Sequence, residues 1–322
     1  MSRAPQKPTR PVAELRAVQD ELAALRERYA ALNQLGEEFA AIKNELASLR
    51  NDFSTIRNRQ VLPLDDGMLA IRHEMGWIVC PSEDFAFVVH FANGFSGHEH
   101  GTGEVIRSFV RPGDTVVDLG AHIGLHSIAL ARAVGPDGMV IAVEPLPRTA
   151  ECLRRAMICN DLYSRCELVV GAAGDTNGCT HFYLGDNSML GSLFPLVDDH
   201  SLVEVREFRL DDHVGPERRV DFVKIDVEGA ELRALDGMRG LIARNDDIVV
   251  VAEYGAPHLE RVGINPADWF AAFADTGLGV SYRIDETNGA LLPVDLDYVA
   301  DLSSYNVLFV KDAQRAAAHL AA

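Results

Sequence analysis

The chain has 322 residues, of which 30 are Lys or Arg and 48 are Asp or Glu, for a formal net charge of −18. This length fits one catalytic-sized domain with an appendage, and it can bury a core without disulfides or a structural metal. Residues 1–60 hold ten basic and eight acidic residues, so the rest of the chain is strongly acidic and, lacking a basic cluster, is not expected to bind nucleic acid.

The cysteines and the apolar runs of the chain indicate its cellular location. The five cysteines form no CxxC pair, which favours a reduced protein. No apolar run reaches 18 residues, and no apolar segment follows the basic start of the chain. We therefore expect a cytoplasmic protein with no membrane span.

After a disordered segment at residues 1–11, a long helix is predicted over residues 12–57. Its apolar residues recur in steps of three and four, with one irregularity beside Gly36, as in a heptad repeat. The apolar stripe is narrow and needs a partner, so we expect a coiled coil that makes the protein a homo-oligomer. The alternatives are a helix folded back on its own domain and a hairpin that turns at Gly36.

Residues 58–110 are expected to form an N-terminal extension of a catalytic domain at 111–312, with a C-terminal tail at 313–322. Short alternating stretches in the extension predict strands at Met68–Arg72, Trp77–Cys80 and Phe85–His90.

In the catalytic domain, short apolar runs alternate with amphipathic segments, which is typical of a parallel sheet covered by helices on both faces. The predicted strands are Thr115–Leu119, Met139–Glu144, Cys166–Gly171, Asp221–Asp226, Ile248–Glu253, Val280–Ile284 and Tyr305–Val310. The predicted helices are His126–Ala133, Arg148–Asn160, Glu231–Ala243 and Pro266–Thr276. Between Gly171 and Asp221 the alternation stops, and THFYLGD and LVEVREFRLDDHV predict an inserted pair of strands.

The stretch VVDLGAHIGLHSIAL places Asp118, Gly120 and Gly124 where the first strand meets its helix. Ligands of open α/β sheets bind at such carboxyl ends of strands. A dinucleotide fingerprint would need glycines at the positions that hold His122 and Leu125, so that pattern fails.

The charge of Asp118 also favours a different cofactor. A carboxylate there would repel a pyrophosphate but would suit the ammonium and sulfonium of S-adenosylmethionine. Glu144 ends the second strand, where an acid can accept both ribose hydroxyls. Either acid could instead cap a helix, but together with GxxxG they indicate an S-adenosylmethionine site.

Four segments, GDTVVDLGAHIGLHSIALA, VEPLPRTAECLRRAMICNDL, REFRLDDHV and VDFVKIDVEGAELRALDGM, resemble FkbM-type methyltransferases, a branch of the class I S-adenosylmethionine-dependent enzymes. The similarity covers roughly Val61 to Lys311 and leaves the heptad segment outside. His122 departs from the group, which usually has Asn at this position.

The resemblance implies a Rossmann-like α/β fold with a seven-stranded, mostly parallel sheet whose last strand, Tyr305–Val310, is antiparallel. It also implies methyl transfer to a hydroxyl group. By position, the implied cofactor residues are Asp118, Gly120, Ala121, His122 and Gly124 on the methionine side, Glu144 at the ribose, Gly171 and Ala172 at the adenine edge, and Asp226 beneath the sulfonium.

A hydroxyl acceptor calls for a general base, because an aliphatic hydroxyl loses its proton reluctantly. Asp226 ranks first among the candidates because it ends a strand beside the cofactor crevice. The others are Glu228, Glu253, His98 and His100, although Asp226 and Glu228 could instead cap the following helix.

We predict no metal. A zinc site could be drawn from His122, His126 and the segment His98–Glu99–His100, and Mg²⁺ could lie at Asp226 with a nearby acid. Undiminished activity after EDTA would exclude both.

The sequence thus predicts an O-methyltransferase that acts on a hydroxyl of a small molecule or glycan, such as a sugar or polyketide. The alternatives are a non-catalytic assembly module with a cofactor-binding domain and a nicotinamide-dependent oxidoreductase.

Overall fold

The structure is a computed structural model that describes residues 22, 25, 26, 28, 33, 34, 36, 39–47, 50, 61–73, 75–84, 88, 99–185, 191–195, 201–296 and 304–320. It divides into two compact units, Met1–Asn58 and Arg59–Ala322. The predicted disordered segment 1–11 and much of the predicted helix 12–57 lie outside the described residues.

All described residues of the first unit are helical, Gly36 included, so the backbone of Gly36 is not that of a turn. Apolar side chains on this helix are between 49% and 75% exposed, namely those of Leu22, Leu25, Phe39, Ile42 and Leu46. The helix therefore carries an uncovered apolar stripe along its described part.

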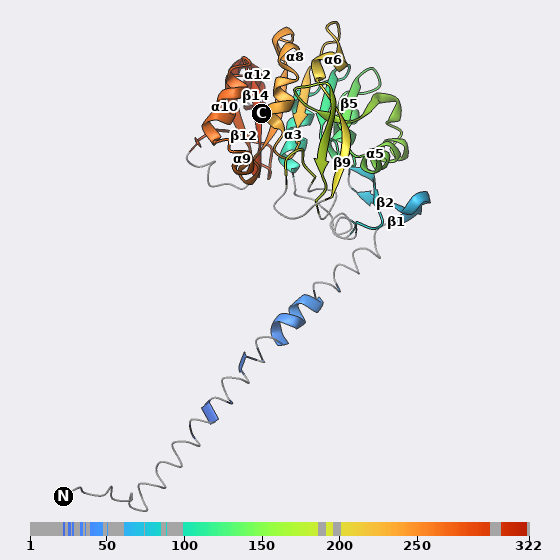
Figure 1. Cartoon of the computed structure of the whole chain (residues 1–322), viewed down its shortest axis with the longest axis vertical. Helices are drawn as coiled ribbons and strands as arrows, with labels where there is room; N and C mark the ends of the chain where they lie inside the picture. The colour runs from blue at the N-terminus through green and yellow to red at the C-terminus, as the bar shows by residue number, and fades with distance from the viewer. Residues whose placement is uncertain are drawn as a thin grey trace, which may run out of the picture. The chain divides into compact units, whose positions relative to one another are not determined.

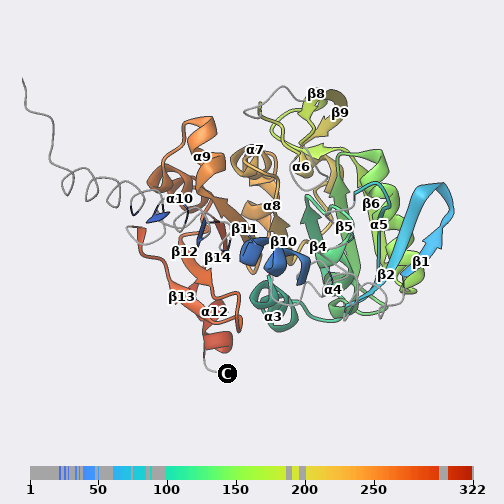
Figure 2. The ribbon, with the colours of Figure 1, turned by 90° about the horizontal axis from the view of Figure 1, so that it is seen from below.

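An eight-stranded sheet forms the centre of the second unit, in the order β13–β12–β14–β11–β10–β4–β5–β6 (Figures 1 and 2). Its strands are β4 (Thr115–Leu119), β5 (Met139–Glu144), β6 (Cys166–Val170), β10 (Phe222–Ile225), β11 (Val249–Gly255), β12 (Val280–Ile284), β13 (Leu291–Pro293) and β14 (Ser304–Val310). Strands β6, β5, β4, β10 and β11 are parallel, and β14 runs antiparallel to β11 and β12.

All seven predicted strands are present, but the predicted count of seven is wrong. The eighth strand, β13, pairs antiparallel with β12 at the sheet edge. It has three residues and follows a tight turn in which Asp285 accepts hydrogen bonds from Thr287. A strand this short shows no alternation that a sequence pattern could reveal.

Helices cover both faces of the sheet. Successive strand residues point to opposite faces, and apolar side chains on each face pack against a layer of helices. One face carries α3 (His100–Phe109), α4 (Leu125–Ala133), α5 (Pro147–Cys159) and α12 (Ala313–Leu320). The other carries α6 (Leu210–Val214), α7 (Glu231–Asp236), α8 (Arg239–Arg244), α9 (Ala256–Val262) and α10 (Pro266–Ala274). Figure 2 shows α3 and α4 on the opposite side of the strands from α7 and α9.

Two predicted segments differ in detail. The predicted helix Glu231–Ala243 is divided into α7 and α8 at Gly237, which packs so tightly on Gly174 that a Cβ there would lie 2.0 Å from the Gly174 oxygen. The predicted tail 313–322 contains α12, whose Ala316 is fully buried. None of the described helices combines the length and the apolar character needed to cross a membrane.

Two small sheets flank the central one. The first holds β1 (Val61–Leu64), η1 (Asp65–Gly67), β2 (Met68–His73) and β3 (Gly76–Pro81), and Asn160 at the end of α5 bonds both backbone groups of Trp77 in β3. Of the predicted strand Phe85–His90, the structure describes Val88 alone and places it in a helical turn on Asp84.

The second small sheet is the predicted insertion. It pairs β8 (Gly178–Tyr183) with β9 (Leu202–Phe208), antiparallel as a hairpin-like pair, and adds β7 (Ala172–Ala173). Because β7 directly follows the carboxyl end of β6, the insertion lies where substrate-facing loops of α/β domains usually lie.

Candidate active site

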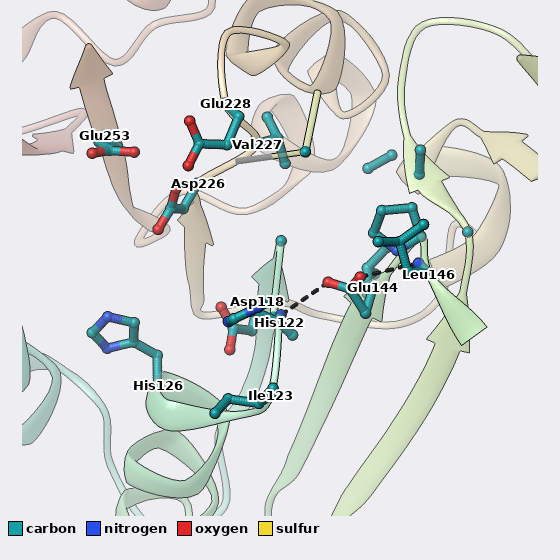
Figure 3. A pocket seen from close by; sticks show the side chains of 18 of the residues that line it. Asp118, His122, Ile123, His126, Glu144, Leu146, Asp226, Val227, Glu228 and Glu253 are labelled. Carbon is teal, nitrogen blue, oxygen red and sulfur yellow. Dashed lines mark hydrogen bonds between the residues drawn. The ribbon is translucent and has the colours of Figure 1, made fainter. Parts of the chain in front are cut away.

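One cavity opens at the carboxyl ends of the central strands. Most of the predicted site residues line it: Asp118, Gly120, Ala121, His122, Glu144, Gly171, Ala172, Asp226, Glu228 and Glu253. The inserted segment contributes Phe182, Gly191 and Leu193. Figure 3 shows Asp226, Glu228 and Glu253 gathered on one side of this cavity and Glu144 on the other.

The turn after β4 is formed by residues with left-handed backbones. Gly120 has φ +79°, and a Cβ there would lie 1.7 Å from the Asp226 carbonyl oxygen, so only glycine fits. His122 has φ +50° although it is not glycine. Gly124 does not line the cavity; with φ +95° it starts α4 against Leu153.

Asp118 is 1% exposed and points from β4 toward the α4 side of the sheet. Its Oδ2 accepts a hydrogen bond from Ser127 Oγ at 2.6 Å, while Oδ1 has no partner among the described residues. Burial raises the pKa of Asp118, against the lowering effect of Lys224. A buried carboxylate oxygen that faces a cavity without a donor is suited to a cationic ligand.

Glu144 is held by backbone groups on both oxygens. Leu146 N donates to Oε1 and His122 N donates to Oε2, each at 3.0 Å (Figure 3). Burial raises the pKa of Glu144 to about 7 despite these donors. Its carboxylate keeps lone pairs free, so it can accept hydrogen bonds from a diol.

Lys224 lies beneath the cavity, 1% exposed on β10, and its Nζ is 2.6 Å from Asp226 Oδ2. Burial disfavours its ammonium, but the charges of Asp226, Glu99 and Asp118 outweigh that effect and raise the pKa of Lys224. Burial likewise opposes ionisation of Asp226, and the Lys224 ammonium reverses this and lowers the pKa of Asp226. One buried cation thus keeps Asp226 charged.

Asp226, Glu228 and Glu253 bring carboxylate oxygens within 4.8 Å of one another. Burial raises the pKa of Glu228 to about 8, and the charge of Asp226 adds to it. The charge of Asp226, followed by burial, raises the pKa of Glu253. These three carboxyl groups could hold a cation, or they could share protons and form hydrogen bonds with hydroxyl groups. The absence of a metal from the reaction stays a prediction.

Two histidines were the remaining candidates for the general base. His98 lies outside the described residues. His100 does not line the cavity; its side chain is 48% exposed and lies 3.6 Å from Glu104.

Sequence reasoning missed three polar residues at the site. Lys224 was not singled out, although a charged residue in the middle of a buried strand is itself a signal. Glu99 and His126 entered only as possible zinc ligands, whereas the structure pairs them with each other at 2.6 Å.

Together these features define an α/β domain whose strand ends offer groups suited to a ligand with both a positive charge and a diol. The chain matches the model of the Methyltransferase FkbM domain over residues 118–282. The protein therefore belongs to the FkbM methyltransferase family, whose members depend on S-adenosylmethionine, and this is its cofactor. No curated protein matches the chain.

Solved structures similar to the chain include several methyltransferases. Aeropyrum pernix fibrillarin with bound S-adenosyl-L-methionine is 14% identical, with a TM-score of 0.39, over 78% of this chain and 98% of that one. TYW2 of M. jannaschii in complex with AdoMet is 13% identical with a TM-score of 0.41, over 78% of this chain and 87% of that one. A SAM-dependent methyltransferase from Aquifex aeolicus is 15% identical with a TM-score of 0.38, over 64% and 87%. At these values the similarities carry no argument about substrate.

The described residues fit the cofactor. The unpartnered Asp118 Oδ1 suits its ammonium, and the turn at Gly120, which lines the cavity, admits no side chain because a Cβ would overlap the Asp226 carbonyl oxygen. Glu144 suits the ribose hydroxyls, while Gly171 and Ala172 line the cavity at the end of β6, near Glu144.

Proposed function

We propose that this protein transfers the methyl group of S-adenosylmethionine to a hydroxyl of a small molecule or glycan, such as a sugar or polyketide. The observation that carries the proposal is the set of three carboxyl groups, Asp226, Glu228 and Glu253, that faces the cavity beside the cofactor residues. Carboxylates accept hydrogen bonds from hydroxyls, and carboxyl groups with raised pKa values donate them. A polyhydroxylated acceptor offers both kinds of partner.

The cofactor supplies an activated methyl group, and the protein's task is to align the acceptor with it and to exclude water. In this proposal Asp118, Gly120, Ala121 and His122 hold the methionine end and Glu144 holds the ribose. Gly171 and Ala172 border the adenine, and Asp226 lies beside the sulfonium. Glu228 and Glu253 orient the acceptor.

The apolar side chains Phe182 and Leu193 of the insertion line the same cavity, where they can cover the non-polar face of an acceptor. The acidic charge of the chain argues against a nucleic-acid acceptor, since both carry negative charge. The five cysteines are unpaired, which supports a reducing location such as the cytoplasm.

The function is tested by incubating the full chain with S-adenosylmethionine and a library of hydroxylated compounds, and by searching for singly methylated products by mass spectrometry. Calorimetry with S-adenosylhomocysteine and NADH separates the methyltransferase from a nicotinamide enzyme. Cofactor binding with no product across the library would favour a non-catalytic assembly module. A repeat with EDTA tests the expectation that no metal takes part.

The proposal includes self-association through the N-terminal helix. Its support is the exposed apolar stripe of Leu22, Leu25, Phe39, Ile42 and Leu46 on helical residues. Light scattering should give a mass above that of one 35.2 kDa chain, and Leu25→Glu with Ile42→Glu should reduce it to the monomer. A monomeric mass for the unmodified chain would contradict this.

A further inference from the structure

His126, the second residue of α4, lies at the cavity beside Asp118 (Figure 3). Its side chain is 12% exposed, so the ring is shielded from bulk water yet borders the space in which ligands would bind. The proposed contacts to the cofactor and the acceptor do not involve the His126 imidazole.

Glu99 holds the imidazole in place. Glu99 Oε2 lies 2.6 Å from His126 Nε2, and Glu99 Oε1 accepts a hydrogen bond from Asn306 Nδ2 at 3.1 Å. The same Asn306 Nδ2 donates to Glu286 Oε1, also at 3.1 Å, and Glu286 accepts two hydrogen bonds from Thr102. Both oxygens of Glu99 are thus bonded, one by α4 and one by β14, and Asn306 is itself bonded to Glu286.

The backbone at Glu99 is consistent with a constrained site. Glu99 has φ +57° and is one of three cavity-lining, non-glycine residues with a left-handed backbone, the others being His122 and Glu228. Such conformations persist only where the surroundings enforce them, and they gather at functional sites.

A carboxylate on one ring nitrogen defines what the other nitrogen can do. With Nε2 donating its hydrogen to Glu99, the neutral ring presents Nδ1 as an acceptor, and the carboxylate stabilises the imidazolium once a proton arrives. Among the described residues no partner of Nδ1 is seen. This arrangement is that of a general base.

The carboxyl groups across the cavity are less suited to that task. Asp226 is paired with Lys224 at 2.6 Å, which weakens it as a base. Glu228 lies 3.1 Å from His258 Nε2, and Glu253 accepts a hydrogen bond from Ser304, so both already have partners. The charged groups around His126 are Glu99 ahead of α3, Asp118 on β4, and Lys224 on β10, which interacts with both of these carboxylates.

We infer that His126, positioned by Glu99, is the general base that removes the proton from the acceptor hydroxyl; this rests on the proposed O-methyl transfer. The acceptor O–H proton moves to Nδ1 of the imidazole while an oxygen lone pair forms the new bond to the methyl carbon. The carbon–sulfur pair leaves with sulfur, so the sulfonium becomes a neutral thioether and the positive charge passes to His126. The imidazolium then returns its proton to water.

The location of His126 is tested by calorimetry with two probes, S-adenosylhomocysteine and sinefungin, which carries an amine at the position of the transferred methyl group. If His126 is the base, the amine of bound sinefungin donates a hydrogen bond to Nδ1. His126→Gln should therefore lower the affinity for sinefungin roughly tenfold and change the affinity for S-adenosylhomocysteine by less than about twofold. His100→Gln, at the exposed histidine of α3, is the matched control and should change neither. Circular dichroism checks that both variants fold.

If His126→Gln lowered the affinity for both probes equally, His126 would lie at the methionine end of the cofactor. If neither affinity changed, His126 would only be a packing residue. Either result overturns the inference. Failure of the unmodified chain to bind either probe would instead refute the proposed function. The two failures are therefore distinguishable.

Turnover supplies the second measurement once the library gives an acceptor. His126→Gln should lower kcat by roughly 10²- to 10⁴-fold, and Glu99→Gln by less, with the KM for S-adenosylmethionine unchanged in both. A kcat of His126→Gln within about twofold of the unmodified chain would overturn the assignment.

Discussion

The two sides of the cavity hold their carboxylates in different ways. On the cofactor side, both oxygens of Glu144 are bonded to backbone N–H groups, and Asp118 has one hydroxyl donor and one oxygen without a partner. On the side that we propose for the acceptor, carboxylate oxygens of Asp226, Glu228 and Glu253 lie within 4.8 Å of one another, and Lys224 is the cation bonded to Asp226. The first side is fixed by the backbone, whereas the second depends on a balance of charges.

The difference indicates how each side would respond to change. A backbone-held site should fail abruptly when the backbone is disturbed, because its donors move together. A charge-balanced site should shift gradually with pH and with single substitutions, because its members redistribute protons. The following predictions test this contrast.

Gly120→Ala should have the largest effect. The added methyl group would overlap the Asp226 carbonyl, 1.7 Å away, and separate the two strand ends. We expect the affinity for S-adenosylhomocysteine to fall by more than about 100-fold in calorimetry. Gly113→Ala is the control, since Gly113 has a similar φ of +91° but nothing within 4 Å of the new Cβ; equal losses in both variants would attribute the effect to general strain.

Lys224→Met should destabilise the fold by roughly 3 kcal/mol, because it leaves Asp118 and Asp226 without their buried cation. Urea denaturation measures the change. Lys311→Met is the control, because Lys311 lies 3.9 Å from an almost fully exposed Asp246 and such surface pairs contribute little. If Lys224→Met were as stable as this control, the acceptor side would not depend on its ammonium.

Glu144→Gln should weaken S-adenosylhomocysteine binding about tenfold at pH 8. The ionised carboxylate is the form that accepts the ribose hydroxyls, and its pKa is about 7, so the affinity of the unmodified chain should fall as the pH drops from 8 to 6. Glu231→Gln is the matched control, a buried glutamate with a pKa of about 7 that does not line the cavity. A pH dependence that persists in Glu144→Gln would assign it to another group.

Glu228→Gln should have the smallest effect, seen in thermal unfolding. The pKa of Glu228 rises from 4.5 to about 8 on folding, so the unfolded chain loses this proton first and stability falls as the pH increases across that interval. Between pH 5 and 8, the decrease in Tm should be a few degrees smaller in Glu228→Gln than in the unmodified chain. Glu260→Gln on the exposed side of α9 should leave the slope unchanged; an identical slope in both variants would contradict the raised pKa.

Much of the site follows from local sequence. Asp118, Gly120 and Glu144 lie at the ends of strands that their apolar runs predict, and strand ends of a parallel sheet meet at one edge. The seven main strands follow for the same reason. The edge strand β13 does not, because three residues show no alternation. The break between α7 and α8 and the helix α12 were not predicted either.

The sequence by itself determined the family, the cofactor and the acids at the strand ends, because each is written in a few contiguous residues. Only the tertiary structure joined Glu99 to His126, 27 residues away, and to Asn306, 207 residues away. It also placed Lys224 next to Asp118 across two paired strands. Such pairings depend on which strands are neighbours and which face each side chain takes, and no local pattern encodes either.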